Sequence, residues 1–227
     1  MLVKNWMSKK VITVGPDESM QDAIYILQEQ NIKILPVMDK KKIVGIITDR
    51  DLKKASPSDA TTLDMHELLF LISKIKVRDL MKKQVYIANP DDTVEEAAAV
   101  LLEKKISGVP VVDENNRLLG IITRSDIFRV LISLTGMGKK GVQFAIRIKD
   151  MPGPINEVRE LIHEYGARTA SILSSWDNAP PDYLNIYFRV YRIDRQKLPL
   201  LLDKIKEKGT LLYMVDHRED KRTVYEL

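Results

Sequence analysis

The fold is decided by two related heptapeptides: Gly45-Ile46-Ile47-Thr48-Asp49-Arg50-Asp51 and, 75 residues further on, Gly120-Ile121-Ile122-Thr123-Arg124-Ser125-Asp126. Upstream of them, eleven residues from Val3 to Asp39 recur from Val77 to Asp113 at a constant spacing of 74, and one inserted residue accounts for the change of spacing. Matches that keep a constant spacing indicate a tandem duplication. Residues 1–135 therefore contain two copies of one structural unit.

Each copy predicts the order β-α-β-β-α from its hydrophobic pattern and its capping residues. In the first copy we expect a strand at 11–14, a capped helix at 19–30, strands at 34–37 and 43–48, and a second helix from Asp51. The second copy repeats these elements. Strand ends and helix starts then lie together, where backbone N–H groups bind phosphate most easily.

The composition is that of an ordinary folded protein. Of 227 residues 44% are hydrophobic and 30% are charged, and 36 Lys and Arg against 32 Asp and Glu give a formal charge of +4. The absence of cysteine excludes disulfides, thiolate metal sites and cysteine nucleophiles. The longest apolar run, Ala97–Leu102, is too short to cross a bilayer, and residues 1–10 lack the apolar core of a secretory signal. We therefore expect a soluble, cytoplasmic protein.

The duplicated unit resembles the CBS domain, and the tandem resembles a Bateman module. The resemblance rests on both heptapeptides, on Leu35-Pro36-Val37, and on Gly108-Val109-Pro110-Val111-Val112-Asp113. It implies an adenine nucleotide (AMP, ADP or ATP), or a related ligand such as S-adenosylmethionine, bound in clefts that join elements of both copies.

The repeated Thr-x-x-Asp has two interpretations. It can cap a helix, or its Asp can bind ribose hydroxyls while the helix start meets phosphate. The resemblance implies the second role, with Asp51 and Asp126 on ribose and with phosphate bound by Thr48, Arg50, Thr123 and Arg124. It places the base beside Thr13, Val14, Leu35, Pro36, Ile87, Ala88, Val109 and Pro110.

The two heptapeptides differ between Thr and Asp. The first carries Asp49-Arg50 and the second Arg124-Ser125. Because Asp49 repels a polyphosphate, we expect the second copy to favour phosphate and the first to favour a nucleoside or monophosphate.

The remaining chain predicts a second domain of the α+β class. Its strands and helices follow the order β-α-β-β-α-β, which is a ferredoxin-like sandwich. Asp150-Met151-Pro152-Gly153, between the first strand and the first helix, resembles the ligand loop of an ACT domain. At the next turn Gly166-Ala167-Arg168-Thr169 lacks the Asn usual in that family, so a dimerising role is as well supported as binding of a small molecule.

We expect six segments: the first CBS repeat at 1–60, a connecting helix at 61–76, the second CBS repeat at 77–135, a linker at 136–141, an ACT-like domain at 142–217 and a charged tail at 218–227. A CBS pair followed by an ACT domain resembles the AcuB-type acetoin-utilisation proteins of bacteria.

These features predict a regulatory sensor and not an enzyme. His66, His163 and His217 are scattered, and we find no catalytic pair, metal-ligand spacing or Walker loop. We expect a homodimer that acts on a separate enzyme or transporter. Two alternatives stay open: a structural oligomerisation module with unliganded clefts, and a nucleic-acid-binding factor. The basic clusters Lys40-Lys41-Lys42 and Lys139-Lys140 lie beside turn residues, which favours solvated loops over a nucleic-acid patch.

Overall fold

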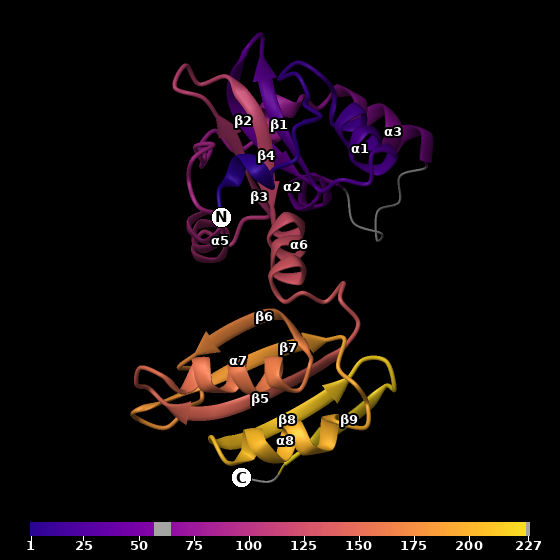
Figure 1. The fold of residues 1–227 in the computed structure, drawn as a ribbon. Helices are drawn as coiled ribbons and strands as arrows, with labels where there is room; N and C mark the ends of the chain where they lie inside the picture. The colour runs from indigo at the N-terminus through magenta and orange to yellow at the C-terminus, as the bar shows by residue number, and fades with distance from the viewer. Residues whose placement is uncertain (57–64, 226–227) are drawn as a thin grey trace. The chain divides into compact units, whose positions relative to one another are not determined.

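The computed structural model describes residues 1–56 and 65–225. The chain folds into two compact units, Met1–Phe128 and Arg129–Leu227, drawn as a ribbon in Figure 1. Of the connecting helix expected at 61–76, residues 61–64 lie outside the described residues, and the described part contains α3 (Met65–Lys74). Within the described part of the chain, no helix has both the length and the apolar content that a bilayer crossing requires.

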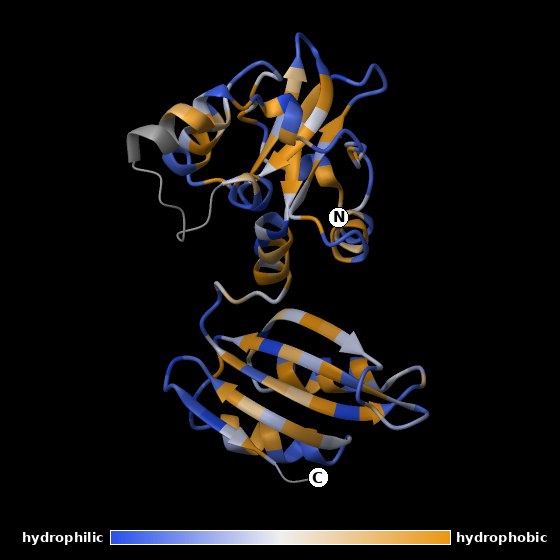
Figure 2. Cartoon of the chain, turned by 180° about the vertical axis from the view of Figure 1, so that it is seen from behind, coloured by the Kyte–Doolittle hydropathy of each residue, from blue (hydrophilic) through white to orange (hydrophobic). Residues whose placement is uncertain are grey.

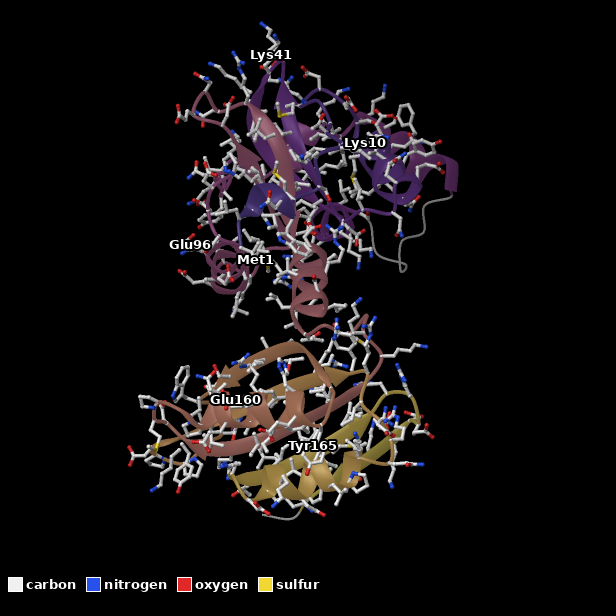
Figure 3. All side chains as sticks on the ribbon, in the orientation of Figure 1. Met1, Lys10, Lys41, Glu96, Glu160 and Tyr165 are labelled. Carbon is white, nitrogen blue, oxygen red and sulfur yellow. The ribbon has the colours of Figure 1, made fainter. Side chains whose placement is uncertain are left out.

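The first unit contains the duplicated copies in the predicted order. The first copy has α1 (Met20–Glu29), β1 (Ile34–Asp39), β2 (Lys42–Thr48) and α2 (Asp49–Ala55). The second has α5 (Val94–Glu103), β3 (Gly108–Val112), β4 (Leu118–Thr123) and α6 (Arg124–Leu134), whose first five residues belong to the first unit. Each strand pair is an antiparallel hairpin. Lys41 lies at the tip of the β1–β2 hairpin and points into solvent (Figure 3), as expected for a solvated basic loop.

The expected strand at 11–14 is reduced to a single residue. Val14 pairs in parallel with Val37 of β1, and Ala88 pairs with Val111 in the same way in the second copy. The pairing stops at Gly15-Pro16, because proline has no N–H to continue a ladder. Val14 is nevertheless buried with α1 and β1 in the core of the first copy.

The two copies exchange the segments that precede them. Ser8, after the short helix η1 (Val3–Asn5), exchanges two backbone hydrogen bonds of 2.9 and 3.0 Å with Ile121 of the second copy. Lys82, after α4 (Val77–Leu80), does the same with Ile46 of the first copy, at 2.9 and 3.0 Å. Figure 3 accordingly shows Met1 beside Glu96 of α5. Each copy is therefore completed by the segment that leads into the other.

The second unit has the predicted ferredoxin-like order with one strand added. Its elements are β5 (Val142–Lys149), α7 (Pro154–Glu164), β6 (Arg168–Ser175), β7 (Tyr183–Tyr191), α8 (Leu198–Lys206), β8 (Thr210–Asp216) and β9 (Lys221–Val224). They form one antiparallel sheet in the order β6-β7-β5-β8-β9. Residues 218–227, expected as a charged tail, instead supply β9, because a turn with Asp220 in the left-handed region pairs Lys221 with Asp216.

Helices α7 and α8 cover one face of this sheet, and the view from behind in Figure 2 shows the other face without a helix. The covered face is apolar and includes Phe144 and Phe188, whose rings stack with centroids 5.2 Å apart. The open face holds Asn185 and Arg189, which are nevertheless only 3% and 5% exposed. Hydrogen bonds compensate part of this burial. Arg189 donates to the carbonyl of Thr135 and to Gln143, both at 2.7 Å, while its Nη1 has no hydrogen-bond partner among the described residues, and Asn185 donates to the carbonyl of Asp177 at 3.2 Å.

Candidate functional site

Two cavities lie where the duplicated copies meet, inside the first unit. The larger, of about 630 Å³, is lined by Ser8, Lys10, Val11, Ile12, Asn31, Ile32, Lys33, Ile34, Arg50, Ser107, Ile121, Thr123, Arg124, Ser125 and Asp126. The smaller, of about 280 Å³, is lined by Lys33, Ile34, Ile46, Thr48, Asp49, Arg50, Lys82, Gln84, Tyr86, Lys105, Ile106, Ser107 and Gly108. We name them the Thr123 cleft and the Thr48 cleft. Both cavities are lined by residues from both copies, and each cavity is the counterpart of the other in the duplicated unit.

Each Thr-x-x-Asp begins a helix with a capping box. At the start of α2, Thr48 donates its N–H and hydroxyl to Asp51 Oδ2 at 3.1 and 2.6 Å, and the Asp51 N–H donates back to the hydroxyl at 3.3 Å. At the start of α6, Thr123 donates likewise to Asp126 Oδ2 at 2.7 and 2.6 Å. The hydroxyl protons are thus directed at the carboxylates. The threonines hold the aspartates in place, and donation from Thr to a phosphate would require this bond to be exchanged.

The two carboxylates have different surroundings. Asp51 Oδ1 lies 3.1 Å from the Lys82 ammonium, whereas the residue of the first exchanged segment that corresponds to Lys82 is Ser8. Burial raises the pKa of Asp51, but hydrogen bonds from Thr48 and Lys82 outweigh it, so its pKa lies below the usual value. Asp126 is 4% exposed and lies on the wall of the larger cleft.

The residues predicted to contact the base do not line these cavities. Val14, Leu35, Ala88 and Val109 are buried in the first unit, and Pro36 and Pro110 are buried beside them in β1 and β3. Thr13 is half-buried and Ile87 is exposed. Their chain neighbours form the walls instead: Val11, Ile12 and Ile34 in the Thr123 cleft, and Tyr86 and Gly108 in the Thr48 cleft.

The clefts are rich in cations that the sequence analysis did not single out. Lys10 and Lys33 line the Thr123 cleft together with the predicted Arg50 and Arg124. Lys82, Lys105 and Lys33 line the Thr48 cleft, where Asp49 also lies, 2.9 Å from the ammonium of Lys53. Lys82 lies in one exchanged segment and Lys10 follows the other, and only the long-range pairing of those segments brings the two lysines to the clefts.

The loop predicted as an ACT ligand site lies in the second unit, between β5 and α7. Asp150 accepts a hydrogen bond of 2.8 Å from the Trp176 indole, and Met151 is 57% exposed. Pro152 follows on the exposed surface, and Gly153 adopts a φ of 116° directly before α7. Among the described residues, His, Asp and Glu nowhere gather in a group of three that could hold a metal ion.

Comparison with known proteins identifies the first unit. The CBS domain model matches residues 3–58 and 77–133. A CBS domain-containing protein of Dictyostelium discoideum is 35% identical over 135 residues, which are 59% of this chain and 93% of that protein.

Two solved structures are also similar to this chain. A candidate acetoin utilization protein (AcuB) from Vibrio cholerae is 27% identical, with a TM-score of 0.51, over 61% of this chain and 95% of that one. The CBS domain pair of protein MJ0100 is 36% identical, with a TM-score of 0.48, over 58% of this chain and 95% of that one. That pair was crystallised with 5′-methylthioadenosine and S-adenosyl-L-methionine. The family match ends at residue 133 and does not extend through the second unit.

Proposed function

The chain belongs to the CBS-domain family, and we propose on this premise that it is a non-catalytic regulatory sensor that binds an adenosine-containing ligand between its two copies. The observation that carries the proposal is the Thr123 cleft. A buried carboxylate, Asp126, is held by its capping box on the wall of a cavity of about 630 Å³ that four cations also line. This volume lies within the ~300–1,000 Å³ of small-molecule sites.

The ligand in this proposal carries both a diol and an anion. The Asp126 carboxylate accepts the ribose hydroxyl protons, while Lys10, Arg50 and Arg124 bind phosphate through charge-assisted hydrogen bonds. Val11, Ile12 and Ile34 supply an apolar wall for the base. AMP, ADP, ATP and S-adenosylmethionine all meet these requirements, the last through the carboxylate of its methionine part in place of the phosphate.

The second unit extends the proposal to assembly. Its ferredoxin-like sheet and the loop Asp150–Gly153 support assignment as an ACT domain that pairs with a second copy or binds a small molecule. The likeness to the AcuB structure supports a role in acetoin utilisation. A homodimer that acts on a separate enzyme or transporter is part of the proposal. A cytoplasmic location belongs to the proposal, because a sensor works where its nucleotide pool is.

Thermal unfolding of the full chain tests the proposal, with AMP, ADP, ATP and S-adenosylmethionine added separately. A ligand at about one hundred times its dissociation constant stabilises the folded state by about 2.7 kcal/mol, which gives a clear rise in Tm. We expect the rise with at least one ligand and its loss in Asp126→Ala.

The matched control is Asp22→Ala. Asp22 completes the same kind of capping box at the start of α1, with Ser19, yet lines neither cleft. Asp22→Ala should lower Tm without removing the ligand response. If no ligand raises Tm, the structural oligomerisation module with unliganded clefts is the better account, and the Thr-x-x-Asp pairs are helix caps alone.

A further inference from the structure

Lys33 and Arg50 line both clefts, and we name them the shared cations. Lys33 directly precedes β1, and Arg50 lies in the first turn of α2, so both belong to the first copy. At the repeat spacing the second copy has Ser107 and Ser125 in their places. If the clefts were symmetric, each would have its own pair of cations at these positions. Here the first copy supplies one pair, and that pair lines both clefts.

Each of the remaining cations lines only one of the two clefts. Lys10 and Arg124 line only the Thr123 cleft, whereas Lys82 and Lys105 line only the Thr48 cleft. Each cleft also has one carboxylate among its lining residues, Asp126 in the Thr123 cleft and Asp49 in the Thr48 cleft, but Lys82 is in addition 3.1 Å from the Asp51 carboxylate. The Thr48 cleft therefore has less uncompensated positive charge of its own and depends more on the shared cations to hold an anion.

We propose that the two clefts compete for the shared cations, so that an anionic ligand in one cleft weakens the binding of an anionic ligand in the other. An uncharged nucleoside needs no counter-charge, and it binds either cleft independently of the other. The sensor therefore accepts one phosphate-bearing ligand with high affinity, in the Thr123 cleft, while the Thr48 cleft remains open to an uncharged adenosyl ligand. This inference rests on the proposed function and names the regulation of the same site.

The expected coupling follows from Coulomb's law. Two phosphates that contact one pair of side chains lie about 10 Å apart, and two dianions at that separation repel enough to change a dissociation constant by roughly tenfold even in the dielectric of water. Salt shortens the Debye length to about 4 Å near 0.5 M, so the coupling must weaken at high ionic strength.

Isothermal titration of the full chain with adenosine and with AMP tests the proposal. At about 20 mM NaCl we expect two adenosine sites that fill independently and two AMP steps, with a ratio of dissociation constants roughly tenfold larger for AMP than for adenosine, and this excess shrinks in high salt. Arg50→Ser should weaken both AMP steps, because Arg50 lines both clefts. Arg124→Ser should weaken one, and the exposed Lys54→Ser on the same helix as Arg50 should weaken neither.

The outcomes separate the inference from the function on which it rests. Two AMP steps that are equal in affinity, or an Arg50→Ser variant that loses affinity in one step only, would overturn the shared-cation proposal while leaving the sensor intact. One site for adenosine and one for AMP would also overturn it. If neither adenosine nor AMP binds, and the thermal assay finds no other ligand, both proposals fail together.

Discussion

Gly45 and Gly120, the first residues of the two heptapeptides, have no room for a side chain. A Cβ on Gly120 would lie 2.5 Å from Met7 Sδ and 3.0 Å from the Ser8 carbonyl oxygen, and a Cβ on Gly45 would meet Met81 and Lys82 in the same way. The exchanged segments thus cross directly over these glycines. The repeated glycine is explained by this crossing, because it permits the backbones to approach closely.

At the residue scale we predict that Gly120→Ala and Gly45→Ala each destabilise the first unit by about 1–3 kcal/mol, since the added methyl group overpacks the crossing. Urea denaturation followed by circular dichroism measures the effect. Gly138→Ala is the control, because a Cβ there meets nothing within 4 Å. Equal stability of the Gly120 and Gly138 variants would show that the exchanged segment can move aside without cost.

At the element scale, the capping box at the start of α6 sets the orientation of Asp126. Thr123→Val removes the hydroxyl that exchanges hydrogen bonds with Asp126 at 2.6 and 3.4 Å. We predict a loss of about 1 kcal/mol from the cap together with weaker binding of AMP. Thr93→Val breaks the equivalent cap of α5 and should cost similar stability with unchanged AMP affinity. The two variants are compared by urea denaturation and calorimetric titration, and equal AMP affinity in both would assign Thr123 to the cap alone.

The elements of both units could be predicted from the sequence because hydrophobic period and capping residues are local signals. Ala23 and Leu27 are buried on α1 as their spacing indicates, and Leu184 and Ile186 are buried on β7. Asp51 and Asp126 were singled out because each lies three residues after a repeated threonine, but of the two only Asp126 lines one of the clefts. The long-range pairings had no such signal.

The pairing of the exchanged segments could not be predicted from the sequence. Ser8 pairs with Ile121, more than a hundred residues away, and nothing in the local pattern distinguishes that partner from the nearer Ile46. Lys10, which follows Ser8, was therefore missed as a cleft residue. Strand β9 was missed for a related reason, since its four residues are charged at one end and gain strand structure only by pairing with β8.

At the scale of the whole molecule, each unit has its own apolar core. Because the two cores share no residues, a two-step thermal transition is the expectation for this chain. A ligand bound in the clefts should raise only the Tm of the first unit, because every residue that lines either cavity lies before residue 129.

The transition of the second unit should instead respond to pH through His217, at the end of β8. Burial lowers the pKa of His217 below 6.5, and the charges of Arg189 and Arg222 lower it further against the opposing effect of Asp216 and Asp220. The unfolded chain therefore binds a proton more readily than the folded one. The stabilisation is present above pH 6.5 and is lost as the pH falls through the folded pKa.

Differential scanning calorimetry between pH 7.5 and 5 checks this prediction, a range chosen because it brackets the usual pKa of histidine, about 6.5. The Tm of the second unit should fall with pH in the wild-type chain and fall less in His217→Gln, which cannot take up a proton. His163→Gln, on an exposed position of α7, is the matched control and should keep the wild-type slope. A slope that His217→Gln leaves unchanged would mean that the His217 ring is already solvated in the folded state, and that acid sensitivity of this unit arises from its carboxylates.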